Sequence, residues 1–440
     1  MSRMTTLATA TAIARAAWAG IDPEGFFRRH SSDTEPFLLK LPGLGEALFV
    51  STVDGARDIL TAPGTLCRAP LPNPIEPVVG QNSLILLSGD AHRRTRSILM
   101  PAFRGERMRS YVDLIADATN DEIAALQPGD QLVVRDAAQA ITLDVVIRVV
   151  FGVTDPARRA EYARVTKELM RSGSAPLMLV PWLRREIAGR GPWAQLVGFR
   201  AQLDRLLSEQ IEERRAMGEH GSDVMELILT ATDEDGNTLG ADALRDQLRT
   251  MLAAGHETSS TSLAWALYHT HRDESIRSRL VEELAHAATP QEIAALPYLG
   301  AVIQETLRMH PTVPIVLRRL TGPLTVAGVP RSAGDVVGIA LPALHFNPDV
   351  WKDPDSFDPD RFLDGKPSPF AYAPFGGGYR HCIGAAFAQN ELAVAIGTIM
   401  NTVELRAPAR EQRRKPPRAV PRGIATKPSR EILLDVIARR

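Results

Sequence analysis

The chain has 440 residues, of which 44% are hydrophobic, so it can bury a large core. Its 51 Lys and Arg residues nearly balance 52 Asp and Glu residues, and the net charge of -1 gives no reason to expect nucleic acid or an anionic membrane as a partner. Two cysteines, Cys67 and Cys382, cannot form a disulfide framework and fit a reducing cytoplasm. No apolar run approaches the roughly 18 residues of a membrane anchor.

Helical periodicity dominates the sequence. Apolar residues recur every three or four positions with charged residues between them, which predicts amphipathic helices. The predicted helices span residues 104–126, 157–172, 194–217, 240–272 and 273–287. Strand-like runs are short and few. They are EALFVS near residue 46, LTVAGVP near 324, DVVGIAL near 335 and ILLDVI at the C-terminus.

The chain shows no division into several folded units. It has no internal repeat, no low-complexity block and no break in composition. The segment 406–430 is rich in Arg, Lys and Pro, and we expect it to run over the surface before the last strand. The prediction is one mainly α domain with small β-sheets over residues 1–440, of which residues 1–40 are the least informative.

A basic stretch occupies residues 86–103, LLSGDAHRRTRSILMPAF. His92 and Arg96 are four residues apart and would share one helix face, with Arg93 and Arg94 beside them. Such a row suits an anionic group, but an ordinary basic surface would show the same pattern. The residues alone leave both interpretations open.

The predicted helix 240–272 contains a polar interruption, AGHETSSTS, from Ala254 to Ser262. Its glycine and hydroxyl residues are poor in a helix interior, because the hydroxyls compete for backbone carbonyls and can bend the helix. A local conflict in a well-formed helix indicates a functional site, although a polar face on a core helix is the alternative. The zinc-peptidase motif HExxH is excluded, because Ser260 stands where the second histidine is required.

The segment 297–311, PYLGAVIQETLRMHP, carries an apolar stripe with Glu305 and Arg308 on the opposite face. These two side chains are three residues apart and can pair. On an exposed helix such a pair contributes only about 0.2–0.5 kcal/mol. Taken alone, the residues favour a solvated surface.

Cys382 stands near the end of the loop FGGGYRHCIG, residues 375–384, directly before the helix-like run AAFAQNELAVAIGTIM. A lone cysteine is usually a small buried hydrophobic residue. Here the glycines permit positive φ or close approach to a flat ligand. Helix N-terminal amides would favour a thiolate, and Arg380 adds positive charge for the thiolate or for a ligand anion. The chain lacks partners for a four-ligand zinc site, so the loop indicates a thiolate ligand with one open side.

Together with FDPDRF at residues 357–362, these stretches resemble the cytochrome P-450 family of haem-thiolate monooxygenases. FGGGYRHCIG matches F-x-x-G-x-R-x-C-x-G at every specified position, AGHETS matches A-G-x-(D/E)-T, and ETLR matches E-x-x-R. The motifs follow the family's order, and the resemblance runs from about residue 40 to the end of the chain. It implies the P-450 fold, with haem between the long central helix and the helix after the cysteine loop.

The resemblance also implies roles for individual residues. Haem b would bind through the Cys382 thiolate as axial ligand, a donor that favours O–O cleavage. Thr258 would hold an ordered water at the oxygen site, and Glu257 would feed protons through a water chain. The other residues that the resemblance places at the haem are His92, Arg96, Arg318, Arg380, Phe375, Gly376, Ala254 and Gly255. A one-residue shift would exchange Arg318 for Arg319.

A second group resembles a structural network rather than a cofactor site. Glu305, Arg308 and Arg361 match positions that form ion pairs behind the haem in the family. Removal of one partner would leave a buried charge unpaired, at a cost of several kcal/mol. We therefore expect these three residues to serve folding.

The haem domain fills the chain, so the resemblance implies a separate electron donor of ferredoxin or flavodoxin type with its reductase. A basic surface could dock an acidic donor, or it could be a plain solvated face. Its residues are Arg93, Arg94, Arg104, Arg107 and Arg109. Apolar stretches near residues 66–89 and 312–317 favour a lipophilic substrate such as a fatty acid, terpene or steroid, although any packed loop would be apolar too.

The expected activity is a cytoplasmic monooxygenase that inserts one atom of O2 into such a substrate, without nucleic acid or membrane anchor. The alternatives are a haem-thiolate peroxygenase or isomerase, and a haem-binding sensor without turnover. A peroxide-driven enzyme or a sensor would have no use for the pair formed by Glu257 and Thr258.

Overall fold

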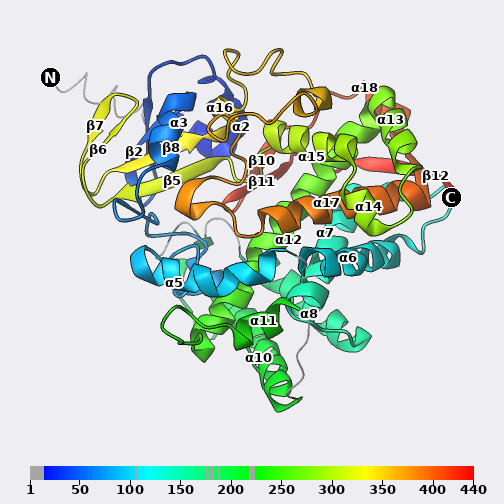
Figure 1. Ribbon diagram of the computed structural model, residues 1–440, viewed down its shortest axis with the longest axis horizontal. Coiled ribbons are helices and arrows are strands. Elements are labelled where there is room, and N and C mark those ends of the chain that lie inside the picture. The colour runs from blue at the N-terminus through cyan, green and yellow to red at the C-terminus, as the bar shows by residue number, and fades with distance from the viewer. Residues whose placement is uncertain are drawn as a thin grey trace.

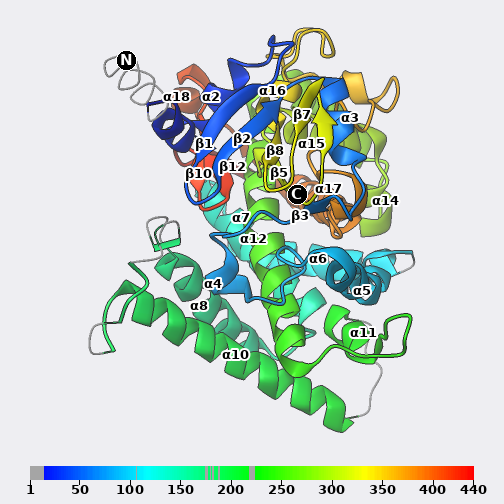
Figure 2. The same ribbon diagram turned by 90° about the vertical axis from the view of Figure 1, so that its left-hand side faces the viewer.

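The computed structural model describes residues 14–105, 107–173, 177–178, 180, 183–186, 189–217 and 223–440. The long helix α12 (Ala241–Arg272) runs through the centre of the molecule (Figures 1 and 2). A part rich in β-strands lies at one end of α12, and α8 (Pro156–Ser172) and α10 (Pro192–Met217) lie at the other. Residues 1–13 of the predicted domain lie outside the described residues.

Helices form most of the described chain. Before α12 the remaining helices are α2 (Pro23–Arg28), α3 (Val53–Leu60), α4 (Glu76–Val79), α5 (Gly89–Leu99), η1 (Met100–Phe103), α6 (Arg107–Ile123), α7 (Val134–Val145), η2 (Val146–Val150) and α11 (Val224–Thr230). After it they are α13 (Glu274–Leu284), α14 (Pro290–Ala294), α15 (Pro297–Met309), α16 (Leu341–Leu344), η4 (Pro359–Phe362), η5 (Gly378–Arg380), α17 (Ala385–Thr402) and α18 (Ala409–Arg413). Among the described helices, none has both the length and the apolar character that a bilayer crossing requires.

The five long predicted helices correspond to α6, α8, α10, α12 and α13. Their ends follow from local capping. Asp155 caps α8 by accepting the Arg158 N–H, and Pro156 occupies the first turn, where its missing N–H costs nothing. Asp273 ends α12 in an extended conformation and caps α13 by accepting two backbone N–H groups. Helix α13 begins one residue later and ends three residues earlier than the prediction of 273–287.

The main sheet has five strands in the order β1 (Phe37–Leu41), β2 (Gly45–Val50), β8 (Val336–Ala340), β5 (Ile315–Leu320) and β3 (Cys67–Arg68). Strands β2 and β8 pair in parallel, with Ala47 opposite Val336, and the other pairs are antiparallel. Every residue of β8 is buried, which explains its uninterrupted apolar sequence. This sheet places β5, and with it Arg318, next to the cysteine loop.

Three smaller sheets complete the fold. They are β4 (Gln131–Val133) with β12 (Leu433–Arg439) and β9 (Val403–Arg406), β6 (Leu324–Val326) with β7 (Val329–Arg331), and β10 (Ala419–Arg422) with β11 (Ala425–Pro428). Most residues of the segment 406–430 are exposed or half-buried, as predicted, but the segment also forms secondary structure. This segment holds α18 and the β10–β11 hairpin, which docks inward because the Thr426 N–H donates to the Thr312 carbonyl (2.8 Å).

Candidate functional site

The loop before α17 turns sharply at Cys382. Its backbone N–H donates to the Phe375 carbonyl at 3.0 Å. Gly376 and Gly378 have φ angles of +64° and +63°, a region that strains any other residue. A Cβ at Gly378 would also lie 2.0 Å from the Leu60 carbonyl oxygen. Glycine is therefore required both by the turn and by close packing on the end of α3.

Cys382 is in part open to solvent, although protein atoms crowd its sulfur on the other sides. Cys67, in contrast, is buried. Burial raises the pKa of the Cys382 thiol, while the Gly384 N–H and the positive charge of Arg96 lower it in part. The cation that acts on the sulfur is thus Arg96, which leaves Arg380 to the other predicted role, beside a ligand anion. Without metal the thiol is favoured, but a bound metal ion would remove its proton.

Four basic side chains gather beside this loop, and we call them the basic cluster: His92 and Arg96 on α5, Arg318 on β5 and Arg380 in η5. His92 is 4% exposed. Burial and the positive charges of the three arginines lower its pKa to about 4. Burial likewise lowers the pKa of Arg318. The fold thus brings together four residues that are up to 288 positions apart in the chain.

The basic cluster has no carboxylate partner among the described residues. Arg96 donates to the His381 carbonyl (2.8 Å), and Arg380 donates to the Ile85 carbonyl (3.1 Å). Arg318 reaches only the carbonyl of its neighbour Leu317 (2.9 Å). The Nε atoms of Arg318 and Arg380 are buried without a hydrogen-bond partner. Unpaired buried cations are costly, so this arrangement fits a bound anionic group.

The structure distinguishes Arg318 from Arg319. Arg318 is 6% exposed, and its guanidinium lies over the Tyr379 ring, 5.7 Å from the centroid. The side chain of Arg319 points elsewhere and donates to the Gly334 carbonyl at 2.9 Å. Successive residues of a strand point to opposite faces, so only one of the two can join the basic cluster.

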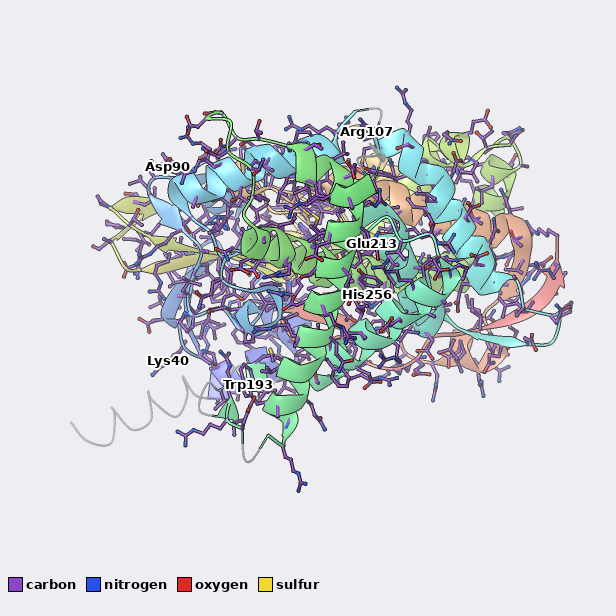
Figure 3. The ribbon with its side chains drawn as sticks, turned by 90° about the horizontal axis from the view of Figure 1, so that it is seen from below. Lys40, Asp90, Arg107, Trp193, Glu213 and His256 are labelled. Atoms are coloured by element: carbon purple, nitrogen blue, oxygen red, sulfur yellow. The ribbon has the colours of Figure 1, made fainter. Side chains whose placement is uncertain are left out.

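Helix α12 is buried along most of its middle, but one face is partly exposed. Ala254 and Gly255 lie on that face, and Thr258 follows one turn later. The neighbouring His256 and Ser259 are buried. His256 lies near the middle of the molecule in Figure 3. Phe375 and Gly376 of the cysteine loop are also partly exposed. Accessible faces on both α12 and the cysteine loop are what a flat cofactor between them requires.

Thr258 and Glu257 have different partners. The Thr258 hydroxyl donates to the Ala254 carbonyl at 2.5 Å, which leaves its oxygen free to accept a hydrogen bond. Glu257 turns to the other side, where its Oε2 pairs with Arg422 Nε (2.6 Å) and its Oε1 accepts from Gln139 (3.2 Å). Burial raises the pKa of Glu257, while the charge of Arg135 and the Gln139 hydrogen bond lower it in part.

Glu305, Arg308 and Arg361 form the ion-pair network, and the solvated surface favoured by the residues alone is wrong. Glu305 and Arg308 are both 0% exposed and are joined by two hydrogen bonds of 2.6 and 2.7 Å. Arg361 Nε adds a third contact to Glu305 at 3.2 Å. The segment around η4 covers this face of α15, a tertiary contact that helical spacing cannot reveal.

Comparison with known proteins identifies the family. The family model described as Cytochrome P450 matches residues 27–434. Putative cytochrome P450 138 of Mycobacterium tuberculosis is 32% identical over 410 residues, which cover 92% of this chain and 88% of that protein. Putative cytochrome P450 135B1 of the same organism is 33% identical over 372 residues, or 84% and 78% of the two chains. This chain belongs to the cytochrome P450 family.

A solved structure shares the fold. The structure titled "Retinoic acid bound cyanobacterial CYP120A1" aligns with a TM-score of 0.80 and 24% identity, covering 91% of each chain. The predicted fold class is therefore confirmed. Cytochromes P450 carry haem b on a cysteine thiolate, use O2 and need a redox partner, so the predicted enzyme class and cofactor are confirmed as well.

The P450 fold also reveals residues that the sequence motifs did not identify. Tyr379 occupies an unspecified position of the cysteine motif, yet its ring lies between His92 (centroids 5.6 Å apart), Arg318 and Arg380. Arg422 is 165 positions from Glu257 and has no sequence signal. Glu391 could have been found, because it is the one acidic residue in the apolar run that forms α17.

Proposed function

We propose that Cys382 is the axial ligand of haem in this P450 and that His92, Arg96, Arg318 and Arg380 hold the haem propionates. The basic cluster carries this proposal. It places basic donors, two of them with an unpaired Nε, beside the cysteine loop, and no carboxylate in the described part of the chain pairs with them. Two propionates would supply the missing negative charges and hydrogen-bond acceptors.

Haem in this position would pack between two faces of the protein. Ala254 and Gly255 of α12 would contact one face, and Phe375 and Gly376 of the cysteine loop the other. All four residues are partly exposed. When bound, haem supplies dioxygen activation, and the residues of the chain position the water molecules and protons that the reaction consumes.

Thr258 would accept a hydrogen bond from a water at the oxygen site and orient it there. Support comes from its place on the accessible face of α12 and from a hydroxyl proton already donated to Ala254. Glu257 would relay protons from the side of Gln139 and Arg422. Burial raises the pKa of Glu257 and favours uptake of a proton, whereas the ion pair with Arg422 favours the carboxylate, so protonation would loosen that ion pair.

The electron donor would be an acidic protein of ferredoxin or flavodoxin type, supplied with electrons by its reductase. The exposed arginines of α5, of the turn after η1 and of α6 support this choice. Figure 3 shows Asp90 and Arg107, which lie in α5 and α6, at the edge of the molecule. Helix α5 also donates through Arg96 to the His381 carbonyl, next to Cys382. A donor on this face would therefore lie close to the haem ligand. The full set is Arg93, Arg94, Arg104, Arg107 and Arg109.

The substrate would be a lipophilic small molecule, such as a fatty acid, terpene or steroid, hydroxylated or epoxidised in the cytoplasm. Support comes from the segment that packs against α12 from α4 onward. There Val79, Leu84 and Leu86 are buried apolar residues. The polar side chains of this region bond within the protein, as when Gln247 of α12 accepts the Leu84 N–H (3.0 Å). Apolar lining of this kind selects substrates by shape and hydrophobicity.

The absorption spectrum of the reduced, haem-loaded protein under carbon monoxide tests the proposal. A cysteine thiolate opposite carbon monoxide shifts the Soret band far to the red of its position in a histidine-ligated haem. We expect this band in the wild type and in Cys67→Ala, and its loss in Cys382→Ala. A red-shifted band that survives Cys382→Ala would refute the ligand assignment.

Reductant use then separates an enzyme from a sensor. A monooxygenase consumes reductant in proportion to the substrate that it oxidises.

Charge reversal at Arg93 and Arg94 should slow electron transfer from an acidic ferredoxin and weaken the dependence of the rate on salt. An unchanged rate in this variant would assign these arginines to a plain solvated face.

A further inference from the structure

The β10–β11 hairpin has two faces with different surroundings. On one face Thr426 is buried, and its N–H donates to the Thr312 carbonyl at 2.8 Å. Arg422 lies opposite Ala425 across the hairpin, and Lys427 follows Ala425 by two positions, so the two cations share the other face. The cationic face is half-buried. The hairpin lies beside α12, against which β11 packs (Figures 1 and 2).

A third cation, Arg135 near the start of α7, belongs to the same region, and we call Arg135, Arg422 and Lys427 the hairpin cations. Each of them is half-buried. Burial and the charge of Arg135 lower the pKa of Lys427, whereas the charges of Glu257 and of the exposed Glu431 oppose this decrease. Burial raises the pKa of Glu257, and the charges of Arg135 and Lys427 are among the effects that oppose this increase. The cations therefore act on one another and on the same carboxyl group.

The hairpin cations have too few counter-charges. Arg422 Nε pairs with Glu257 Oε2 at 2.6 Å, and the Glu257 side chain is 16% exposed. The side chains of Arg135 and Lys427 form no hydrogen bond or ion pair with any residue that the structure describes. Glu431 is exposed, so water and salt screen its charge. Three positive charges held close together repel one another unless further negative charge is present, and this region therefore fits an anionic ligand.

An apolar residue stands beside these cations. Ile424 occupies the turn of the hairpin, two positions after Arg422, and is 39% exposed. On α12, Thr258 directly follows Glu257 and lies on the accessible face at which the proposed function places oxygen. The other face of the hairpin contacts Thr312, the first residue of the apolar run TVPIVL. A ligand with its anionic end at the hairpin cations would thus find apolar surface toward the oxygen side.

We propose that the hairpin cations bind the carboxylate of the substrate, which is therefore a lipophilic carboxylic acid. This inference rests on the proposed function and narrows its substrate class. Arg422 uses Nε for Glu257, so its two Nη groups can donate to a carboxylate, which Lys427 and Arg135 would also approach. The carboxylate anchors the molecule and takes no part in the reaction.

Plain solvation of the three cations is the competing explanation, and matched ligands separate the two. Hexadecanoic acid, abietic acid and lithocholic acid represent fatty, diterpene and steroid skeletons, and each has a methyl ester without the charge. Calorimetric titration of the haem-loaded protein measures the affinity for all six compounds. We expect at least one acid to bind about tenfold more tightly than its ester, as a charged hydrogen bond provides. If none of the three acids reaches this preference, the proposal is overturned.

Lys427→Met tests the site on the protein side. Lys427 has no partner among the described side chains, so its replacement strands no buried group and should leave the fold intact. Affinity for the preferred acid should fall about tenfold, whereas affinity for its ester should stay the same. Arg135→Met should act in the same way. Unchanged acid binding in both variants, or an equal loss for acid and ester, would overturn the proposal.

Arg418→Met is the matched control. Arg418 directly precedes β10 in the chain, its side chain is 73% exposed, and it pairs with Asp22 at 3.4 Å rather than with the hairpin cations. The variant removes the same charge from the same hairpin, and acid affinity should remain within about twofold of the wild type, because exposed charges are well screened. A loss as large as in Lys427→Met would indicate attraction by the overall charge and would overturn the local site.

Sodium acetate distinguishes a substrate site from a site for small free anions. Acetate carries the carboxylate without the apolar chain. It should weaken binding of the preferred acid no more than sodium chloride of equal ionic strength, because the apolar part supplies most of the affinity. Displacement of the acid by acetate well beyond the effect of chloride would assign the hairpin cations to a small anion and overturn the substrate class.

These titrations need no electrons and no turnover, so they separate this inference from the proposed function. If an acid binds preferentially but the haem-loaded protein with its electron donor oxidises no ligand, the proposed function fails and the carboxylate site stands. If acids and esters bind equally and the protein oxidises both, the carboxylate site fails and the proposed function stands.

Discussion

The ion-pair network and the basic cluster both contain a nearly fully buried arginine, yet they are built in different ways. In the network, Arg308 donates to both oxygens of Glu305 and to the carbonyls of His345, Pro354 and Ser356, at 2.6 to 3.2 Å. In the basic cluster, Arg318 donates to one carbonyl and leaves its Nε unpaired. The first arginine has its counter-charge inside the protein, and the second has none among the residues that the structure describes.

This difference separates residues that serve folding from residues that serve binding. A buried charge that is fully paired by the protein gives a stable fold, because loss of either partner strands the other. A buried charge without a partner destabilises the protein until a ligand supplies the opposite charge. The presence of such a residue therefore indicates a binding site. Burial alone does not distinguish the two cases. The hydrogen-bond partners of each N–H group do distinguish them. The same substitution should therefore have opposite consequences at the two sites.

Arg308→Met should have the largest effect on folding. It leaves the Glu305 carboxylate buried with only Arg361 and the Asp358 N–H, so we expect a loss of about 3–5 kcal/mol in the free energy of unfolding. The loss should appear in denaturant titrations of the protein both with and without haem. A variant that unfolds like the wild type would show that the network does not need its buried cation.

Arg318→Met should affect cofactor binding instead. It removes a buried charge for which the described residues offer no carboxylate partner, so the haem-free protein should be as stable as the wild type or more stable. Haem should bind about 10- to 100-fold more weakly, as expected for loss of a charged hydrogen bond of about 1.5–3 kcal/mol. Haem transfer to an acceptor protein measures this change.

Arg319→Met is the matched control for this experiment. Arg319 is the next residue of β5 and donates to the Gly334 carbonyl outside the basic cluster. Haem affinity should be unaffected by its replacement. If Arg319→Met weakened haem binding as much as Arg318→Met, a general disturbance of β5 would explain both results.

His92→Gln should reveal the state of the basic cluster through pH. The pKa of His92 is about 4 in the folded protein, below its usual 6.5, so the unfolded chain binds a proton that the folded chain does not. The stability that neutral His92 contributes is therefore fully present above pH 6.5 and is lost as the pH falls toward 4. On acidification from pH 7 to pH 5, the free energy of unfolding of haem-free His92→Gln should fall by roughly 1–2 kcal/mol less than that of the wild type.

Haem should reduce this difference between wild type and His92→Gln. Propionates next to His92 would raise its pKa toward the usual value, and less stability would then be lost on acidification. Denaturant titrations at several pH values, with and without haem, measure the effect. Other buried histidines titrate in the same pH range. Their contributions cancel in the difference between wild type and His92→Gln, because both proteins contain them. An identical pH dependence with and without haem would place the propionates away from His92.

Much of the fold could be predicted because helical periodicity is a local signal. The long helices α6, α8, α10, α12 and α13 all matched their predicted segments to within a few residues. No local pattern locates the β10–β11 hairpin, because its position depends on the contact between Thr426 and Thr312, which are 114 residues apart. Strands of three or four residues carry too few positions to show an alternating pattern.

The site was predicted unevenly for a related reason. The residues of contiguous motifs, such as Cys382 and Thr258, stand out because several rare features coincide within a few positions. The burial of Glu305 and Arg308 could not be predicted from α15 alone, because the covering segment lies some 50 residues further on. Arg422 illustrates the limit, because only the folded chain brings this residue against Glu257.

Tyr379 offers the finest test of how the basic cluster is held together. Its ring faces Arg318 and Arg380 at 5.7 and 5.5 Å, and its hydroxyl donates to the Cys67 carbonyl at 3.0 Å. An aromatic face attracts each nearby cation by about 0.5–1 kcal/mol, which partly replaces the missing carboxylate. Tyr379→Phe keeps the ring and should retain haem affinity, whereas Tyr379→Leu should lower it about three- to fivefold. Equal affinities in the two variants would mean that backbone carbonyls alone position the arginines.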